Sequence, residues 1–350
     1  MTTPDLIRAA RIDNPKLRER DLATQLGISE AALQAAHVGL GVTRIAAGPD
    51  GLVPRLSALR EVMALTRNAS AVHEKVGRYD NYHSGQHAAM VLTDDIDLRI
   101  FPQHWVHGFA VTRDTEDGPR HSLQIFDAAG DAVHKVFLRD GSDVAAWQAL
   151  VADFATGDTT QTLTTEARPA PEGAKADPAK LDILRAEWAR MTDTHQFMRL
   201  TSKLKYNRLG AYRLVGQPFA QPLAISAVDT VLAEVAAAGI AVMVFVGNRG
   251  CIQIHSGPIK TLRPMGPWQN VMDPRFNLHL RTDHIAEVWL VNKPTKRGDA
   301  ISVEAFDAEG RHILQIFGQR GEKTDMAELE AWDQIAARLP AATPAMEGVV

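Results

Sequence analysis

The sequence predicts an α+β protein built from two copies of one unit, and three observations support this. The chain has 350 residues, more than the ~100–200 residues of a typical single domain. Residues 122–137 (SLQIFDAAGDAVHKVF) align without a gap with residues 302–317 (SVEAFDAEGRHILQIF). Two further pairs of segments align in the same order, 97–105 with 277–285 and 66–75 with 248–257. We therefore expect a tandem structural repeat, each half an antiparallel β-sheet packed with α-helices.

Hydrophobic periodicity and turn residues predict the elements of the first copy in order. Two short helices around Gly27 are expected within 15–38, and a third at 58–67. Strands follow at 88–91, 98–101, 108–112, 123–126 and 133–138. The last two strands form a hairpin, because the Gly of the Asp-Ala-x-Gly turn can adopt positive φ. An amphipathic helix at 143–154 closes the copy.

The second copy repeats this order, with helices predicted at 181–204, 209–215, 228–238 and 326–339. Residues 163–180 are rich in Pro, Ala and charge without apolar periodicity, which is typical of a semi-extended linker. The predicted organisation is an N-terminal repeat at 1–162, a linker at 163–180 and a C-terminal repeat at 181–350. The paired histidines are His73 and His255; pairing 83–85 with 255–257 is an alternative register that needs more gaps.

Composition excludes several classes of protein. The net charge of -4 argues against a general nucleic-acid binder, which needs a basic surface. Cys251 is the single cysteine, so no internal disulfide or multi-cysteine metal site can form, and a small buried hydrophobe is its expected role. The N-terminus does not resemble a signal peptide, and no run approaches the ~20 apolar residues of a membrane helix. We expect a cytoplasmic protein with no stable membrane insertion.

Two motifs that could bind nucleic acid or nucleotides have simpler interpretations. Residues 20–39 resemble a helix-turn-helix with Gly27 at the turn, but the helix after Ser29 has no Lys or Arg to reach DNA. We therefore favour a packed helical hairpin, and the alternative hypothesis, a transcriptional regulator that binds DNA, is less favoured. Residues 39–44 (GLGVTR) are a fragment of a dinucleotide fingerprint that lacks its third Gly.

His195 and several basic or polar residues are candidates for a ligand site. If one helix runs through 181–204, His195 shares a stripe with Leu184, Trp188 and Met191; alternatively MTDT ends one helix and Thr192 or Thr194 caps the next. In either case we expect His195 to face an apolar surface. A neutral imidazole in an apolar setting can ligate haem iron, although a structural role is the commoner one. The other candidates lie in or beside strands or helices: Arg99, Arg208, Lys293, Gln315, Phe317 and Arg320. The basic residues among them are either solvated edge residues or a ring of cations for two carboxylates of a flat ligand.

Longer motifs extend over nearly the whole chain. They are EVMALTRNASAVHEKVG (61–77), DIDLRIF (95–101), MTDTHQF (191–197), MVFVGNRGCIQIHSGPI (243–259), FNLHLR (276–281) and ILQIFGQR (313–320). In these motifs the chain resembles the HemS/ChuS/HmuS family of cytoplasmic haem-handling proteins, often called hemin-degrading factors.

The resemblance implies one non-covalently bound haem b (iron protoporphyrin IX) in a cleft between the halves. It implies an axial His195 from the THQF motif and a distal Arg99 from the DLR motif. If another residue ligates the iron instead, His73 is the first candidate. It also implies haem-binding roles, less directly, for Arg208, Lys293, Gln315 and Arg320, and an aromatic wall at Phe317, where some members carry Tyr. The implied function lies in haem uptake and iron utilisation. Either haem is degraded to release iron with an external electron donor, or it is carried to a separate haem oxygenase.

The implied partners are haem, a haem oxygenase or reductase and the haem importer, and the chain could be a monomer or a homodimer. The candidate ligand residues do not repeat between the copies. His195 has no histidine counterpart near residues 15–20, and Arg99 aligns with His279. The sequence therefore predicts two similar scaffolds but one haem.

Overall fold

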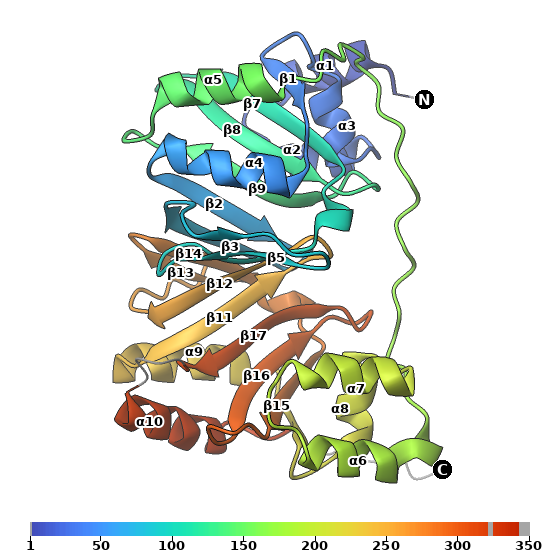
Figure 1. Ribbon diagram of the computed structural model, residues 1–350, viewed down its shortest axis with the longest axis vertical. Coiled ribbons are helices and arrows are strands. Elements are labelled where there is room, and N and C mark those ends of the chain that lie inside the picture. The colour runs from blue at the N-terminus through green and yellow to red at the C-terminus, as the bar shows by residue number, and fades with distance from the viewer. Residues whose placement is uncertain (1, 321–324, 343–350) are drawn as a thin grey trace. The chain divides into compact units, whose positions relative to one another are not determined.

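The computed structural model describes residues 2–320 and 325–342 (Figure 1). The chain forms two compact units. Unit 1 comprises Met1–Asn68, Val72–Pro169 and Gly247–Ile254, and unit 2 comprises Ala69–Ala71, Ala170–Val246 and His255–Val350. Most of each unit is continuous in sequence. The exceptions are residues 69–71, which lie within the first half of the chain but belong to unit 2, and residues 247–254, which lie within the second half but belong to unit 1.

Unit 1 consists of antiparallel strands with helices packed on them. Its main sheet has the strand order β1 (Val42–Ile45), β7 (His107–Thr115), β8 (Gly118–Phe126), β9 (Ala132–Leu138), β2 (Val62–Arg67), β3 (Ala71–Gly77). Residues 251–254 of β12 (Cys251–Pro258) pair with β6 (Asp97–Ile100), which continues to β5 (Ala89–Leu92) and β4 (Tyr82–His83). The helices are α1 (Pro4–Asp13), α2 (Glu19–Gln25), α3 (Glu30–Ala35), α4 (Pro49–Arg55) and α5 (Val144–Phe154), with 3-10 turns at Leu56–Leu59 and Pro102–His104.

Unit 2 repeats this architecture. Its larger group of strands has the order β10 (Ala220–Leu223), β15 (Glu287–Lys293), β16 (Ala300–Phe306), β17 (His312–Gly318), β11 (Ala241–Gly247), and β13 (Trp268–Asp273) pairs with β14 (Phe276–Arg281). The helices are α6 (Leu181–Ala189), α7 (Gln196–Leu204), α8 (Arg208–Val215), α9 (Ala227–Ala238) and α10 (Met326–Ala337), with 3-10 turns at Pro178–Lys180 and Thr282–His284.

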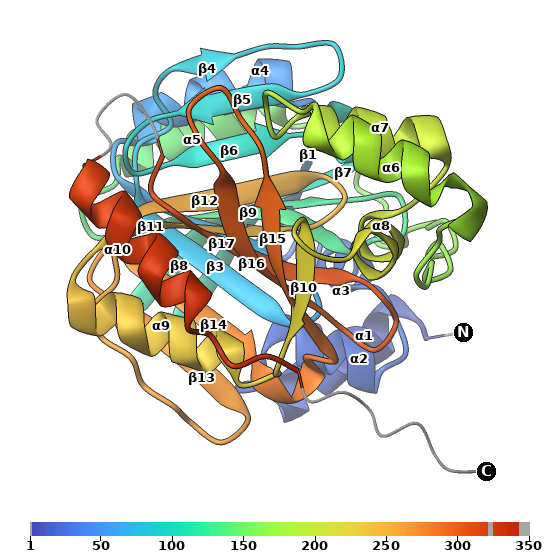
Figure 2. The same cartoon turned by 90° about the horizontal axis from the view of Figure 1, so that it is seen from below.

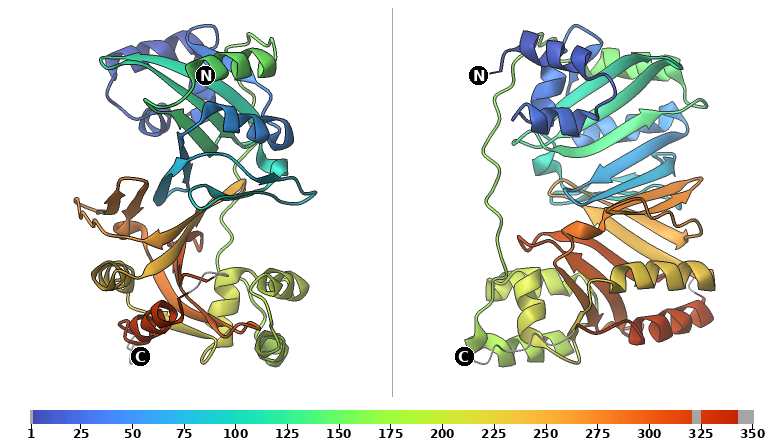
Figure 3. Two further views of the ribbon diagram at one scale, coloured as in Figure 1. Left: turned by 60° about the vertical axis from the view of Figure 1, so that its left-hand side comes forward. Right: turned by 180° about the vertical axis from the view of Figure 1, so that it is seen from behind.

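Alternation along the strands of unit 2 divides its core into two layers. Val303, Ala305 and Ile316 pack with α9 and α10, which lie side by side (Figure 2). Trp289 and Phe306 point to the opposite face and pack with α6–α8. The two helical groups lie on opposite sides of the strands in the left view of Figure 3. Successive side chains of a strand point to opposite faces, so one strand can contribute to both layers.

The repeated hairpins confirm the alignment on which the tandem repeat was predicted. Ser122 pairs with Phe137 in unit 1, and Ser302 pairs with Phe317 in unit 2. Each hairpin has a register irregularity immediately before its turn. Each turn also contains a Gly with positive φ, Gly130 at 78° and Gly310 at 79°. The same turn chemistry therefore produces the same hairpin twice.

The turn between β11 and β12 explains why residues 247–254 belong to unit 1. The side-chain amide of Asn248 donates to the carbonyl oxygens of Val133 (2.8 Å) and Arg67 (2.9 Å). The indole N–H of Trp105 donates to the carbonyl of Gly250 at 2.9 Å. Cys251 is fully buried, as expected, and burial raises the pKa of its thiol to about 12. These bonds satisfy buried polar groups of unit 1.

Two helix predictions are wrong. The helix predicted at 58–67 is a 3-10 turn at Leu56–Leu59 followed by strand β2, whose residues alternate between buried and half-buried and pair with both β3 and β9. The single helix at 181–204 is broken into α6 and α7, as the alternative interpretation of MTDT expected. The predicted Thr cap is also wrong, because the N-cap residue of α7 is His195, without a side-chain capping bond. Helices α1 and α4 were not predicted.

Gly210 provides a stability test of the junction that supports α8. A Cβ atom at this position would lie 2.1 Å from the carbonyl oxygen of Lys175. Because a backbone atom cannot rotate away, Gly210→Ala is expected to lower the free energy of unfolding by roughly 1–3 kcal/mol. Gly173→Ala is the matched control, since a Cβ there would meet nothing within 4 Å. Thermal unfolding followed by circular dichroism should show a lower Tm for the first variant only; equal Tm values would contradict this packing.

Candidate functional site

Two predicted cations of unit 2, Arg208 and Lys293, meet at one buried carboxylate, Glu304. Glu304 lies on β16 and faces α6–α8, between Trp289 of β15 and Gln315 of β17. Lys293 Nζ lies 2.8 Å and Gln315 Nε2 2.5 Å from Glu304 Oε1, and Arg208 Nη1 lies 2.7 Å from Oε2. We call the following residues the Glu304 cluster: Arg208, Tyr212, Lys293, Ser302, Glu304 and Gln315.

The electrostatics of the Glu304 cluster favour a bound anion. Burial alone would raise the pKa of Glu304, but Lys293 and Arg208 outweigh it and hold that pKa well below the usual range. Burial lowers the pKa of Lys293 to about 8, and the attraction of Glu304 prevents a larger fall. Two cations thus share one carboxylate. Arg208, whose side chain is 27% exposed, is the member through which the excess positive charge reaches solvent.

Aromatic rings of the helices enclose the buried end of this cluster. Lys293 Nζ lies 4.9 Å from the ring centroid of Phe197 on α7 and 5.2 Å from that of Tyr212 on α8. Trp188 of α6 packs edge-on against Phe197, with centroids 4.9 Å apart. These cation–π contacts partly replace the hydration that Lys293 loses on burial.

His195 lies outside this apolar layer, so the prediction that it faces an apolar surface is wrong. Leu184, Trp188 and Met191 are buried, but the side chain of His195 is 91% exposed. The reason is the break between α6 and α7, which resets the helical periodicity. His195 Nδ1 lies 2.7 Å from the carboxylate of Asp193, and among the described residues Nε2 has no hydrogen-bond partner. A carboxylate on one ring nitrogen orients an imidazole and leaves the other nitrogen available to a metal.

The remaining predicted residues have separate partners. Phe317 pairs edge-on with Phe245 at a centroid distance of 5.6 Å, on the same face as Gln315. Arg320 donates to the carbonyl oxygens of residues 297–299, at 2.6–3.1 Å. Arg99, in unit 1, is half-buried and forms an ion pair with Asp97. The structure therefore brings together Arg208, Lys293 and Gln315, whereas His195, Arg320 and Arg99 each belong to other local groups.

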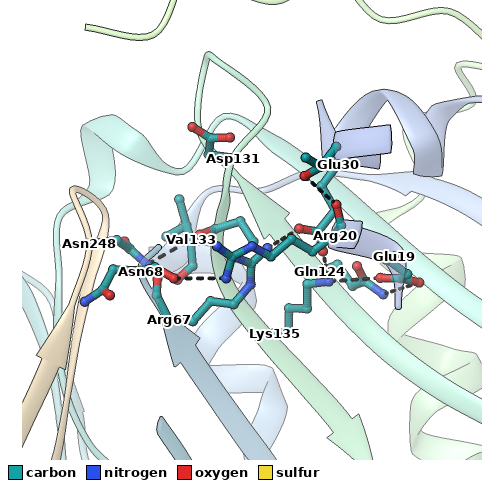
Figure 4. Close-up of polar contacts among 12 residues, drawn as sticks. Glu19, Arg20, Glu30, Arg67, Asn68, Gln124, Asp131, Val133, Lys135 and Asn248 are labelled. Carbon is teal, nitrogen blue, oxygen red and sulfur yellow. Dashed lines mark hydrogen bonds and ion pairs between the residues drawn. The ribbon is translucent and has the colours of Figure 1, made fainter. Parts of the chain in front are cut away.

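Unit 1 contains a buried polar cluster at the equivalent place in its repeat (Figure 4). Lys135 Nζ lies 2.9 Å from Glu19 and also contacts Glu30, which in turn contacts Arg67. Gln124, which pairs across the hairpin with Lys135, corresponds to Glu304, which pairs with Gln315. In unit 1 the carboxylates come from helices α2 and α3 and the cations from strands, so the charges are distributed in a different way from those of unit 2.

Sequence reasoning missed three residues of the candidate site: Asp193, Tyr212 and Glu304. Glu304 had a recognisable signal, because a carboxylate stands between Val303 and Ala305 in a strand whose alternate residues are apolar. Asp193 and Tyr212 had none, since an aspartate before a helix and a tyrosine within one are common. Among the residues that the structure describes, no three or more His, Cys, Asp or Glu side chains gather in a way that could hold a metal ion.

Comparison with known proteins identifies the family. Residues 27–154 and 205–339 each match the model of the haemin-degrading HemS.ChuX domain. The chain belongs to this HemS family. The two matched segments confirm the tandem repeat within this HemS-family chain.

Individual relatives cover almost all of this HemS-family chain. The hemin transport protein HemS of Yersinia enterocolitica is 42% identical over 332 residues, 94% of this chain and 95% of that protein. Holo-PhuS, a heme-binding protein from Pseudomonas aeruginosa, has 40% identity and a TM-score of 0.92, covering 97% of this chain and 100% of that structure. ChuS, an E. coli heme oxygenase, has 35% identity and a TM-score of 0.84, covering 94% and 98%. No helix among the described residues of the chain is long and apolar enough to cross a membrane.

Proposed function

We propose that this chain binds one haem b non-covalently in haem uptake and utilisation in the cytoplasm, with His195 as the axial ligand. The observation that carries the proposal is the Asp193–His195 pair, in which the carboxylate holds Nδ1 while the exposed ring presents Nε2 to solvent. Its place in the THQF motif and the haem-related names of the relatives support it. His73 is the weaker candidate, because its side chain is fully buried in β3.

The other residues of unit 2 fit the polar and flat parts of such a ligand. Arg208 and Lys293 supply positive charge for carboxylates, and Arg208 Nη2 has only the sulfur of Met198, at 3.8 Å, as a partner among the described residues. Met198 lies about one turn after His195, the N-cap residue of α7. Helix α7 therefore carries both the histidine and a residue that contacts the Glu304 cluster. The Phe245–Phe317 pair supplies an aromatic surface. When bound, haem would supply an iron centre able to react with dioxygen.

The proposed activity is degradation of the haem with release of iron, using dioxygen and an external reductant. A carrier that delivers intact haem to a separate oxygenase is the second candidate, because HemS is named a transport protein whereas ChuS is named a heme oxygenase. The test is aerobic incubation of the haem complex with a reductant and catalase. Iron release with an identified open tetrapyrrole supports the enzyme. Loss of that product when catalase is present supports the carrier.

We also propose that Arg99 acts on a small ligand of the haem and does not hold its carboxylates. The basis is the DLR motif, together with the Arg99–Asp97 ion pair that fixes the guanidinium. Arg99→Ala is expected to leave haem affinity within about threefold, less than about 1 kcal/mol, because the guanidinium is paired with Asp97 and is not assigned to a haem carboxylate. It should change the rate at which peroxide reacts with the complex, since a guanidinium can stabilise developing negative charge. Spectrophotometric titration and stopped-flow kinetics measure the two effects, and abolished haem binding would contradict this role.

A further inference from the structure

Glu304 contacts most of the other residues of the Glu304 cluster, and no role in ligand binding has been assigned to it. Its Oε1 accepts from Lys293 (2.8 Å), Ser302 Oγ (2.9 Å) and Gln315 (2.5 Å), and its Oε2 accepts from Arg208 (2.7 Å). Its side chain is 0% exposed, so a ligand cannot reach it directly. It can affect a ligand only through the groups that surround it.

Those surrounding groups keep capacity for a further anion. The ammonium group of Lys293 has three donors and contacts Glu304 and Tyr212, and the guanidinium of Arg208 uses Nη1 for the same two partners. A carboxylate that arrives at Arg208 Nη2 therefore need not displace Glu304. It would neutralise the one positive charge in excess within the cluster.

The repeat shows that the fold does not require a carboxylate at this strand position. The equivalent residue of unit 1 is Gln124, which lies beside Lys135 in the same hairpin register. There the carboxylates that contact Lys135 are supplied from helices, by Glu19 and Glu30. Unit 2 has its carboxylate on the strand and a partly exposed guanidinium, that of Arg208, on the helix. The exchange leaves this guanidinium partly accessible to an anion from solution.

We propose that Glu304 is a positioning residue for the carboxylates of the bound tetrapyrrole: it fixes Arg208, Lys293 and Gln315 in place and keeps Lys293 charged before the ligand arrives. This inference rests on the proposed function. Without Glu304 the ammonium group, whose side chain is 3% exposed, would lose its only carboxylate partner among the described residues. A buried amine without a counter-ion loses its proton, so at neutral pH the cluster would lose the charged donor of Lys293 together with the carboxylate, and Arg208, no longer held by Glu304, would be the one cation left in the cluster for a ligand carboxylate.

The groups that face Lys293 and Glu304 make Lys293 the titrating residue near pH 7–8. Glu304 stays ionised, Arg208 stays protonated and burial raises the pKa of Tyr212 well above its usual value. Burial lowers the pKa of His312, the remaining titratable group on β17. In the natural protein the affinity for a carboxylated ligand should accordingly fall only above about pH 8.

The test compares metal-free protoporphyrin IX with its dimethyl ester, which lacks free carboxylates, in fluorescence titrations of the full chain from pH 6 to 9. The natural protein should prefer the diacid at pH 7. In Glu304→Gln that preference should fall by about tenfold or more, and the pH at which diacid affinity begins to fall should decrease by at least about one unit. Glu234→Gln is the matched control, because it makes the same change of charge on α9 of unit 2, at an ion pair with Arg338 that lies outside the Glu304 cluster. It should behave as the natural protein does.

A second variant keeps the inference testable if Glu304→Gln does not fold. Lys293→Met removes the titrating amine and leaves Glu304 paired with Arg208, so it should abolish the fall in diacid affinity near pH 8. The role of Glu304 would be overturned if the fall in diacid affinity persists in Lys293→Met. It would also be overturned if folded Glu304→Gln keeps the diacid preference and the pH profile of the natural protein. Neither result would contradict the proposed function. Failure of the natural chain to bind either porphyrin would overturn the role of Glu304, and failure to bind ferric haem as well would overturn the proposed function.

Discussion

Replacement of Lys135 by methionine is expected to lower the free energy of unfolding by about 3–5 kcal/mol. Lys135 is 5% exposed and contacts the carboxylates of Glu19 and Glu30, whose side chains are 16% and 6% exposed. Methionine fills a similar volume but carries no charge. The variant would therefore leave two carboxylates close together in a buried region, with Arg67 and Arg113 as their remaining cations. Urea denaturation followed by tryptophan fluorescence measures the change.

Arg168→Met is the matched control for this prediction. Arg168 forms an ion pair with Asp131 at 2.7 Å, but the two side chains are 66% and 44% exposed. Solvent screens such a pair, so its loss should change the free energy of unfolding by less than about 1 kcal/mol. Equal destabilisation by the two substitutions would show that burial does not determine the strength of the Lys135 contacts.

Acid should destabilise unit 1 through Glu19. Burial alone would raise the pKa of this carboxyl, but Lys135 and Arg113 together lower it to about 2, below the usual 4.5. A depressed folded-state pKa stabilises the protein above pH 4.5, and this contribution is lost as the pH falls from 4.5 through 2. The loss amounts to about 3 kcal/mol. Glu19→Gln cannot lose this contribution, so it should show a smaller decrease in stability between pH 5 and pH 3; identical decreases would contradict the low pKa.

The repeat made much of the fold predictable, because the hairpins at 122–137 and 302–317 carry the same turn residues in the same alternating pattern. The errors arose where local pattern and tertiary pairing conflict. Residues 62–67 contain Met, Ala and Leu, which favour helices, yet they form β2 because they pair with strands on both sides. Residues 247–254 lie in the second copy by sequence but pack in unit 1, and no local pattern distinguishes these alternatives.

The site was predictable by residue type more than by environment. Lys293 and Gln315 were predicted as contacts to a ligand, and the structure shows that both already contact Glu304. Their partner depends on strand register, which places Glu304 opposite Gln315. His195 is exposed because the helix is interrupted at residues 190–195, between α6 and α7. In the sequence, apolar residues continue at spacings of three and four across this interruption. Periodicity could therefore identify the histidine but not its surroundings.

The most direct test of the account is the absorption spectrum of the ferric haem complex in the natural chain, in His195→Ala and in His73→Ala. His195→Ala should shift the Soret band and weaken haem binding, whereas His73→Ala should retain the natural band if it folds. Asp193→Asn should keep the band position and lower affinity by about 10–100-fold, because it removes the carboxylate that orients the ligand. An unchanged Soret band and affinity in His195→Ala would show that another residue binds the iron and would contradict the account.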